Sequence, residues 1–149
     1  MTINGIPIHP LVVHAAVVLA PIAALLAVAY VVPKWRDGLR WPLAVVAVVA
    51  AVCVWFAAYT GGQLEDTMRV SMNASPHLAH AIHHHEDLAG KLQASTWVLA
   101  ALGLGAWFLH TRPGLLRNGV LVLLPLGGVA ALVLAVLTGD AGAQAVWAA

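Results

Sequence analysis

Charged residues are scarce in this chain. Lysine, arginine, aspartate and glutamate make up 9% of its 149 residues, whereas apolar residues make up 62%, and the mean hydropathy is +0.90. A soluble domain carries about a quarter charged residues. With so few charges the chain cannot cover a water-exposed surface, so the sequence predicts an integral membrane protein. The length predicts a single domain over residues 1–149.

Other absences exclude further classes. Cys53 is the only cysteine, so no internal disulfide can form, and we expect it to be a small buried apolar residue. The net charge of +1 gives no electrostatic basis for a nucleic-acid partner. Residues 1–33 carry no charge, so they lack the basic n-region of a signal peptide and we expect them to be retained. No hydrolase motif or phosphate-binding glycine loop occurs.

Long apolar runs predict four transmembrane helices, because a bilayer core about 30 Å thick needs about 20 apolar residues of helix. The expected helices cover residues 9–32, 43–60, 77–110 and 118–138. We expect the second to end at Thr60-Gly61-Gly62 and the fourth at Thr138-Gly139. The fold class is therefore all-α, an integral membrane four-helix bundle.

Basic residues in the short loops predict the orientation. Two loops carry most of them: Lys34, Arg36, Arg40, Arg112 and Arg117. Only Arg69 and Lys91 lie at the opposite end, so the basic loops are predicted to be cytoplasmic and both termini non-cytoplasmic. The two halves of the chain share a similar pattern, in which His14 and Thr60-Gly61 correspond to His85 and Thr138-Gly139. This similarity predicts a two-plus-two pseudo-repeat.

Histidine is the unusual residue, with eight copies. Helical spacing places two kinds of face on the outer part of the third helix. One face is entirely polar: His77, His80, His84, Asp87 and Lys91. The opposite face is apolar except at His85, with Leu78, Ile82, Leu88 and Leu92 around it. His85 is thereby predicted to face the interior of the bundle.

A histidine inside a membrane bundle is costly and is by default a functional hypothesis. His14, among apolar residues of the first helix, is predicted to be a second one. Neutral imidazoles on facing helices are the axial ligands of haem in four-helix bundles, so the first hypothesis is haem b held by His14 and His85. The alternative is that each is simply buried, hydrogen-bonded to Thr60, Thr138 or a backbone carbonyl.

The polar histidines suggest a second hypothesis, a site for a divalent copper, zinc or iron ion. His80 and His84 stand four residues apart and can chelate one ion, with Asp87 on the same face and His9 as a further ligand. The alternative is a solvated polar face. His110, at the opposite end of its helix, is expected to be an interfacial residue with no special role.

The segment Ile8–His14, with its His-Pro-x-x-x-His pattern, resembles the opening of the bacterial four-helix membrane family labelled domain of unknown function 2231. Further similar elements are His85-Glu86 with Leu88 and Gly90, the two Thr-Gly pairs, and Gly142 with Val146-Trp147. The likeness covers nearly the whole chain. The extra histidines between His77 and His84 depart from the family pattern, as do Ala15 and Ala16. Relatives joined to Rieske-type iron–sulfur domains imply redox chemistry.

Together these observations predict a small haem b protein for electron transfer, near the outer surface of the bacterial inner membrane. Its expected partners are the lipid bilayer and a redox partner. A third hypothesis is a structural subunit of a larger membrane complex. Small residues four apart, such as Gly127 and Ala131, would serve that role or a homo-oligomer.

Overall fold

The computed structural model describes the backbone of residues 2–3 and 6–147, and the side chains of residues 9, 11–66, 73 and 75–147. Its four long helices are α1 (Ile8–Ala29), α2 (Arg36–Ala74), α3 (Pro76–Phe108) and α4 (Leu115–Trp147). A short 3₁₀-helix, η1 (Pro33–Trp35), precedes α2. Before α1, the two-residue strands β1 (Thr2–Ile3) and β2 (Ile6–Pro7) pair antiparallel.

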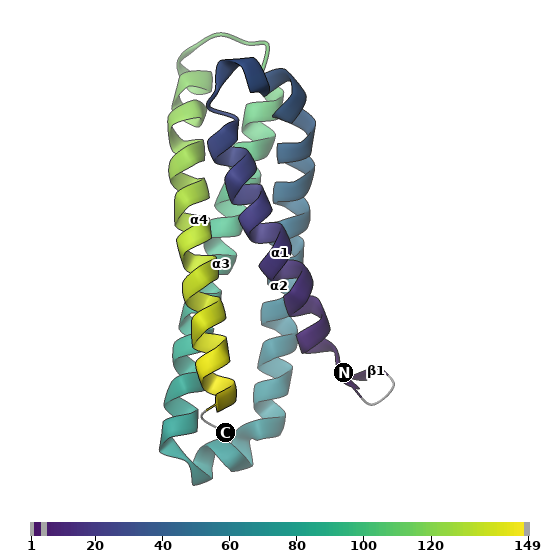
Figure 1. The fold of residues 1–149 in the computed structure, drawn as a ribbon, viewed down its shortest axis with the longest axis vertical. Coiled ribbons are helices and arrows are strands. Elements are labelled where there is room, and N and C mark those ends of the chain that lie inside the picture. The colour runs from purple at the N-terminus through teal and green to yellow at the C-terminus, as the bar shows by residue number, and fades with distance from the viewer. Residues whose placement is uncertain (1, 4–5, 148–149) are drawn as a thin grey trace.

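The helices run up and down in one elongated bundle (Figure 1). Each packs against its neighbours in the chain, and α1 closes the ring against α4. Both termini and the α2–α3 junction lie at one end of the bundle, which we call the terminal end. The α1–α2 and α3–α4 connections lie at the other, which we call the loop end.

The helices α2 and α4 are longer than predicted. Neither ends at its Thr-Gly pair: α2 continues to Ala74 and α4 to Trp147. A glycine inside a helix costs only about 1 kcal/mol relative to alanine, and packing against neighbouring helices offsets such a cost. The predicted loop 61–76 is therefore reduced to Ser75, whose Oγ accepts a hydrogen bond from the Leu78 amide and caps α3.

Alanine and glycine form most of the buried core, as expected for helices that approach closely in lipid. The loop-end half of the core contains Ala23, Ala27, Ala47, Ala50, Ala51, Ala100, Ala106 and Ala131, with Leu43, Leu99 and Leu124. The closest approach joins α1 to α4, where a Cβ added to Gly128 would lie 2.8 Å from the Ala24 carbonyl oxygen. Small residues thus set the spacing between the helices.

Large apolar side chains cover the outside of the bundle, among them Leu11, Val18, Leu25, Trp55, Val98, Val122 and Val136. Exposed apolar surface on this scale marks a protein whose solvent is lipid. In the described part of the chain, three helices are long and apolar enough to cross a membrane, with the candidate spans Leu11–Ala29, Pro33–Asp66 and Leu115–Trp147. The outer part of α3 is more polar.

Candidate functional site

The His9 imidazole, at the start of α1, packs against α2 at the terminal end. Its Nδ1 lies 3.0 Å from the carbonyl oxygen of Ala57 and 3.2 Å from Oγ1 of Thr60. The Thr60 hydroxyl donates in turn to backbone carbonyls of α2. Because a carbonyl oxygen can only accept, Nδ1 carries the proton. The other ring nitrogen, Nε2, is left with its lone pair.

The His85 imidazole, on α3, makes the same kind of contact with α4. Its Nδ1 lies 3.0 Å from the carbonyl oxygen of Thr138. The carbonyl oxygen can only accept, so Nδ1 carries a proton here too. A hydrogen bond from a buried His85 to a backbone carbonyl was the alternative to haem ligation in the sequence analysis. It occupies only one ring nitrogen, so it is compatible with a ligand role.

Each imidazole lies against a glycine. A Cβ added to Gly61 would be 3.1 Å from Cε1 of His9, and one added to Gly142 would be 3.0 Å from Cε1 of His85. Both distances are tighter than ordinary van der Waals contact. Gly61 and Gly142 therefore leave the space in which the two rings lie. Gly139, by contrast, has nothing within 4 Å of an added Cβ.

His85 is near enough to affect the titration of His9. Burial is the main reason that the pKa of His9 lies below its usual range; the hydrogen bond to Ala57 opposes this, and the charge on His85 lowers the pKa further. His9 therefore favours the neutral form, in which an imidazole can bind a metal.

A buried hydroxyl completes this end of the molecule. Thr138 is 8% exposed, and its Oγ1 has no hydrogen-bond partner although the carbonyl of the same residue accepts from His85. Buried polar atoms in native proteins are nearly always satisfied by protein, water or ligand. An unpaired hydroxyl beside His85 is thus suited to a water or a polar group of a bound molecule.

The prediction that His14 lies inside the bundle is wrong, because its side chain is exposed. The reason is geometric. Successive residues turn by about 100° around a helix, so His14 is about 140° away from His9 on α1. Only one of the two can face α2 in this way, and His9 does.

The predicted metal ligands His9, His80, His84 and Asp87 are not brought together. Among the described residues, they form no group of three or more close ligand atoms. Asp87 pairs with Lys91, with 2.6 Å between Oδ2 and Nζ. His80 and His84 do lie together: with His77 they line a groove of about 260 Å³, whose other wall is Ala141 and Gln144 of α4.

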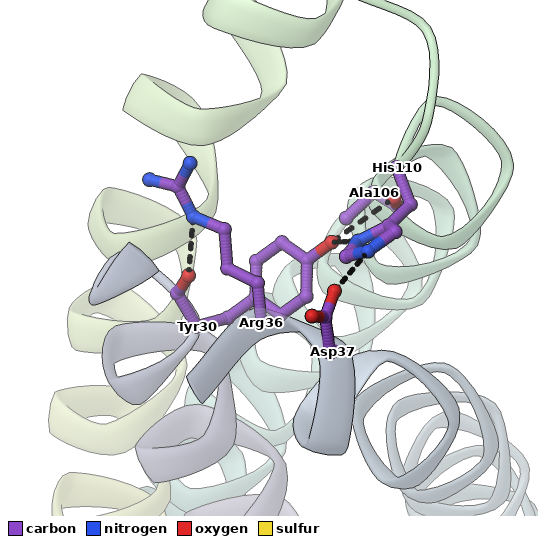
Figure 2. Close-up of polar contacts among 5 residues, drawn as sticks. All are labelled: Tyr30, Arg36, Asp37, Ala106 and His110. Atoms are coloured by element: carbon purple, nitrogen blue, oxygen red, sulfur yellow. Dashed lines mark hydrogen bonds and ion pairs between the residues drawn. The ribbon is translucent and has the colours of Figure 1, made fainter. Parts of the chain in front are cut away.

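A second polar cluster lies at the loop end and joins three helices (Figure 2). The buried Tyr30 hydroxyl, at the end of α1, is 2.8 Å from Nδ1 of His110 and 3.3 Å from the Ala106 carbonyl oxygen. Nε2 of His110 is 2.7 Å from Oδ1 of Asp37 near the start of α2. The three side chains form a chain of hydrogen bonds from the core to an exposed carboxylate.

Sequence reasoning missed this cluster and gave His110 no special role. One signal was present: Asp37 is the only acidic residue among the basic residues of its loop. Arg36 in the same loop closes α1, since its Nε donates to the Tyr30 carbonyl at 3.1 Å and its Nη2 to the Val31 carbonyl at 2.8 Å. The loop residues therefore hold the ends of α1, α2 and α3 together.

A family model described as "Predicted membrane protein (DUF2231)" matches residues 5–149. No curated protein and no solved structure matches the chain. The match includes both histidines at the terminal end and the hydrogen-bonded chain at the loop end. The protein therefore belongs to the DUF2231 family of predicted membrane proteins, and it is a helical bundle in contact with the lipid bilayer.

Proposed function

We propose that the protein is a small membrane haem b protein that transfers electrons, with His9 and His85 as the two axial ligands. The observation that carries the proposal is the shared geometry of these histidines. Each donates from Nδ1 to a helix carbonyl and lies against a glycine. Ligating histidines usually make this second hydrogen bond, which sets the tautomer and ring orientation and raises ligand basicity.

The number of ligands favours haem over a bare ion at this pair. Zinc and similar ions take three or four protein ligands, whereas haem iron takes only axial ones from the protein. In the part of the chain that the structure describes, His9 and His85 belong to no group of three close ligand atoms. Haem supplies one-electron exchange at a potential set by its ligands and surroundings; the chain supplies two oriented imidazoles.

The proposed pair replaces His14 with His9. Visible spectra of the detergent-purified protein, expressed with ample haem and recorded before and after dithionite reduction, test it directly. The wild type and His14→Ala should show a Soret band that sharpens and shifts on reduction, with resolved α and β bands. His9→Ala and His85→Ala should each lose the low-spin spectrum. A featureless wild-type spectrum would overturn the haem proposal.

We further propose that α3 is a fourth membrane span and that the terminal end is non-cytoplasmic, in a bacterial inner membrane. The apolar part of α3 lies alongside the three candidate spans (Figure 1). Five of the seven basic residues, Lys34, Arg36, Arg40, Arg112 and Arg117, lie at or next to the loop end. Positive charge in short loops favours the cytoplasmic side.

Equivalent contacts also support the two-plus-two repeat, but they pair His85 with His9 and not with His14 as the sequence predicted. Shifting α1 by 76 residues onto α3 relates His9 to His85 and Ala27 to Gly103 (85 − 9, 103 − 27). Shifting α2 by 81 residues onto α4 relates Ala57, Gly61 and Ala47 to Thr138, Gly142 and Gly128 (138 − 57, 142 − 61, 128 − 47). The contacts of the two histidines then coincide, as do the Ala27–Gly128 and Gly103–Ala47 contacts. His9, rather than His14, is the partner of His85 in this repeat.

A second candidate function is divalent-metal binding through His77, His80 and His84, favoured by the groove that these side chains line against α4. It predicts that metal content falls in His80→Ala and His84→Ala but not in His85→Ala. A protein that shows neither haem nor metal in any of these assays would instead be a packing subunit of a larger membrane complex or a homo-oligomer.

A further inference from the structure

The face of α3 that points toward α2 carries a third group of ligand atoms. Glu65 of α2 and His83 and Glu86 of α3 each place one ligand atom within 4.8 Å of the other two. Nδ1 of His83 lies 3.4 Å from Oε2 of Glu86. Neither His9 nor His85 belongs to this group, and the groove on the α4 side contains none of its members.

The spacing suits a single ion. A divalent metal bound at about 2.1 Å holds its ligand atoms roughly 3–3.5 Å apart. The observed separations need only small side-chain rotations to reach that range.

The mixture of donors indicates the class of metal. Carboxylates alone suit calcium and magnesium, whereas an imidazole added to them favours zinc, iron or another first-row transition metal. Glu65 and Glu86 are half-buried while His83 is exposed. Three protein ligands on an open surface leave further coordination positions for water.

The position gives the ion a role in the fold. Gln63, Glu65 and Asp66 follow the apolar run of α2 in the sequence, so the group lies where α2 and α3 continue beyond the apolar part of the bundle. In the chain, the two helices are connected through Ser75 at the far end of these extensions. An ion held from both sides would tie these extensions together.

We propose that Glu65, His83 and Glu86 form a site for one divalent transition-metal ion of the zinc class, separate from the His9–His85 pair. The site bridges α2 and α3 at the terminal end. Because the ion site and the His9–His85 pair use different residues, the proposed ion site does not depend on haem binding.

Zinc binding to the detergent-purified, chelator-treated full chain tests the site, by titration against a chromophoric competitor. The wild type should bind one Zn²⁺ per chain at this site, and Glu65→Ala or His83→Ala should weaken that binding at least tenfold. His14→Ala is the control, because it removes an exposed histidine of α1 that belongs to neither metal group, and it should leave the affinity unchanged.

A thermal scan gives a second readout. Zinc should raise the unfolding midpoint of the wild type and of His14→Ala, since a ligand that binds only the folded state stabilises it. It should not raise that of Glu65→Ala. Wild-type affinity in Glu65→Ala and His83→Ala would overturn the proposal, as would binding that is lost only in His80→Ala and His84→Ala, which would place the ion in the groove instead. The haem spectrum of each variant distinguishes this outcome from failure of the axial pair.

Discussion

At the scale of single residues, the positions without a side chain matter as much as the histidines. His9 and His85 each occupy space that a methyl group on Gly61 or Gly142 would take. Sequence reasoning read the Thr-Gly pairs as helix ends because glycine commonly terminates helices. In the structure the helices continue. Gly61 of the first pair, and Gly142 three residues after the glycine of the second, make room for imidazoles from another helix.

Gly142→Ala should therefore displace His85, since the new Cβ would meet a ring atom at 3.0 Å. Overpacking of this kind costs about 1–3 kcal/mol, so we expect a lower thermal midpoint and a weakened haem spectrum. Gly139→Ala is the matched control: its Cβ meets nothing within 4 Å, and alanine is the better helix former. Equal behaviour of the two variants would argue against the close ring contact.

The lowered pKa of His9 predicts a dependence of stability on pH. Because burial lowers the pKa in the folded state, the unfolded chain binds a proton more readily than the folded chain. This contribution is present above the unfolded value of 6.5 and is lost as pH falls through the lower folded pKa. Thermal midpoints measured from pH 7.5 to 5 should fall less in His9→Gln than in the wild type, whereas the exposed His14→Gln should follow the wild type.

Helical periodicity predicted only part of the site, because it shows which residues share a face of one helix. The apolar face of α3 correctly marked His85 as different from His80 and His84, because all three lie on one continuous helix. Periodicity could not show which of His9 and His14 faces the neighbouring helix. Both lie at the start of an apolar run, and without a polar face the sequence does not indicate which side of that helix points into the bundle. Contacts between helices, such as His9 with Ala57, follow from packing and not from spacing along one helix.

At the scale of elements, hydrogen bonds and close backbone contacts hold the helices in register. The chain from Tyr30 through His110 to Asp37 ties α1, α3 and α2 together at the loop end (Figure 2). The Tyr30 hydroxyl has one hydrogen, so it can donate either to His110 or to the Ala106 carbonyl. Protonation of Nδ1 would direct it to Ala106.

Tyr30→Phe should lower stability by about 1–2 kcal/mol, because it removes a buried hydroxyl and leaves its partners unsatisfied. The measurement is the thermal midpoint in detergent. Tyr59→Phe removes a hydroxyl from an exposed residue on α2 and should have little effect. A midpoint unchanged in Tyr30→Phe would show that the hydrogen-bonded chain contributes nothing to holding these helix ends.

The approach of α1 to α4 gives a sharper test of packing. Gly128→Ala places a Cβ 2.8 Å from the Ala24 carbonyl oxygen, and backbone cannot rotate away as a side chain can. We expect a loss of about 1–3 kcal/mol from overpacking, seen as a lower thermal midpoint. In Gly119→Ala the added Cβ has open space, so this variant should be as stable as the wild type or slightly more so.

At the scale of the whole molecule, composition was enough to predict the class and the arrangement. The scarcity of charge and the four apolar runs predicted a helical membrane bundle, and the family match agrees. The lengths of α2 and α4 could not be predicted in the same way. Hydropathy detects where lipid ends, whereas a helix such as α2 continues past that point to Ala74.

The proposed orientation predicts the behaviour of reporters fused to the C-terminus. An alkaline phosphatase fusion, active only outside the cytoplasm, should be active, while a fluorescent-protein fusion that needs the cytoplasm should be dark. Moving the phosphatase to the 109–114 connection should abolish its activity. The reverse pattern of activities would show the opposite orientation, with the histidine pair on the cytoplasmic side.

The length of α2 has a consequence for energy conversion. At 1.5 Å per residue its 39 residues extend about 58 Å, nearly twice the hydrocarbon thickness of about 30 Å. His9 lies in the first turn of α1, at the terminal end of the bundle, so an electron carried at the proposed His9–His85 pair would arrive and depart at the edge of the insulating layer. Moving one charge across the layer involves about 2.3 kcal/mol per 100 mV. Turnover confined to this end would therefore be insensitive to voltage and would neither build nor dissipate the proton-motive force.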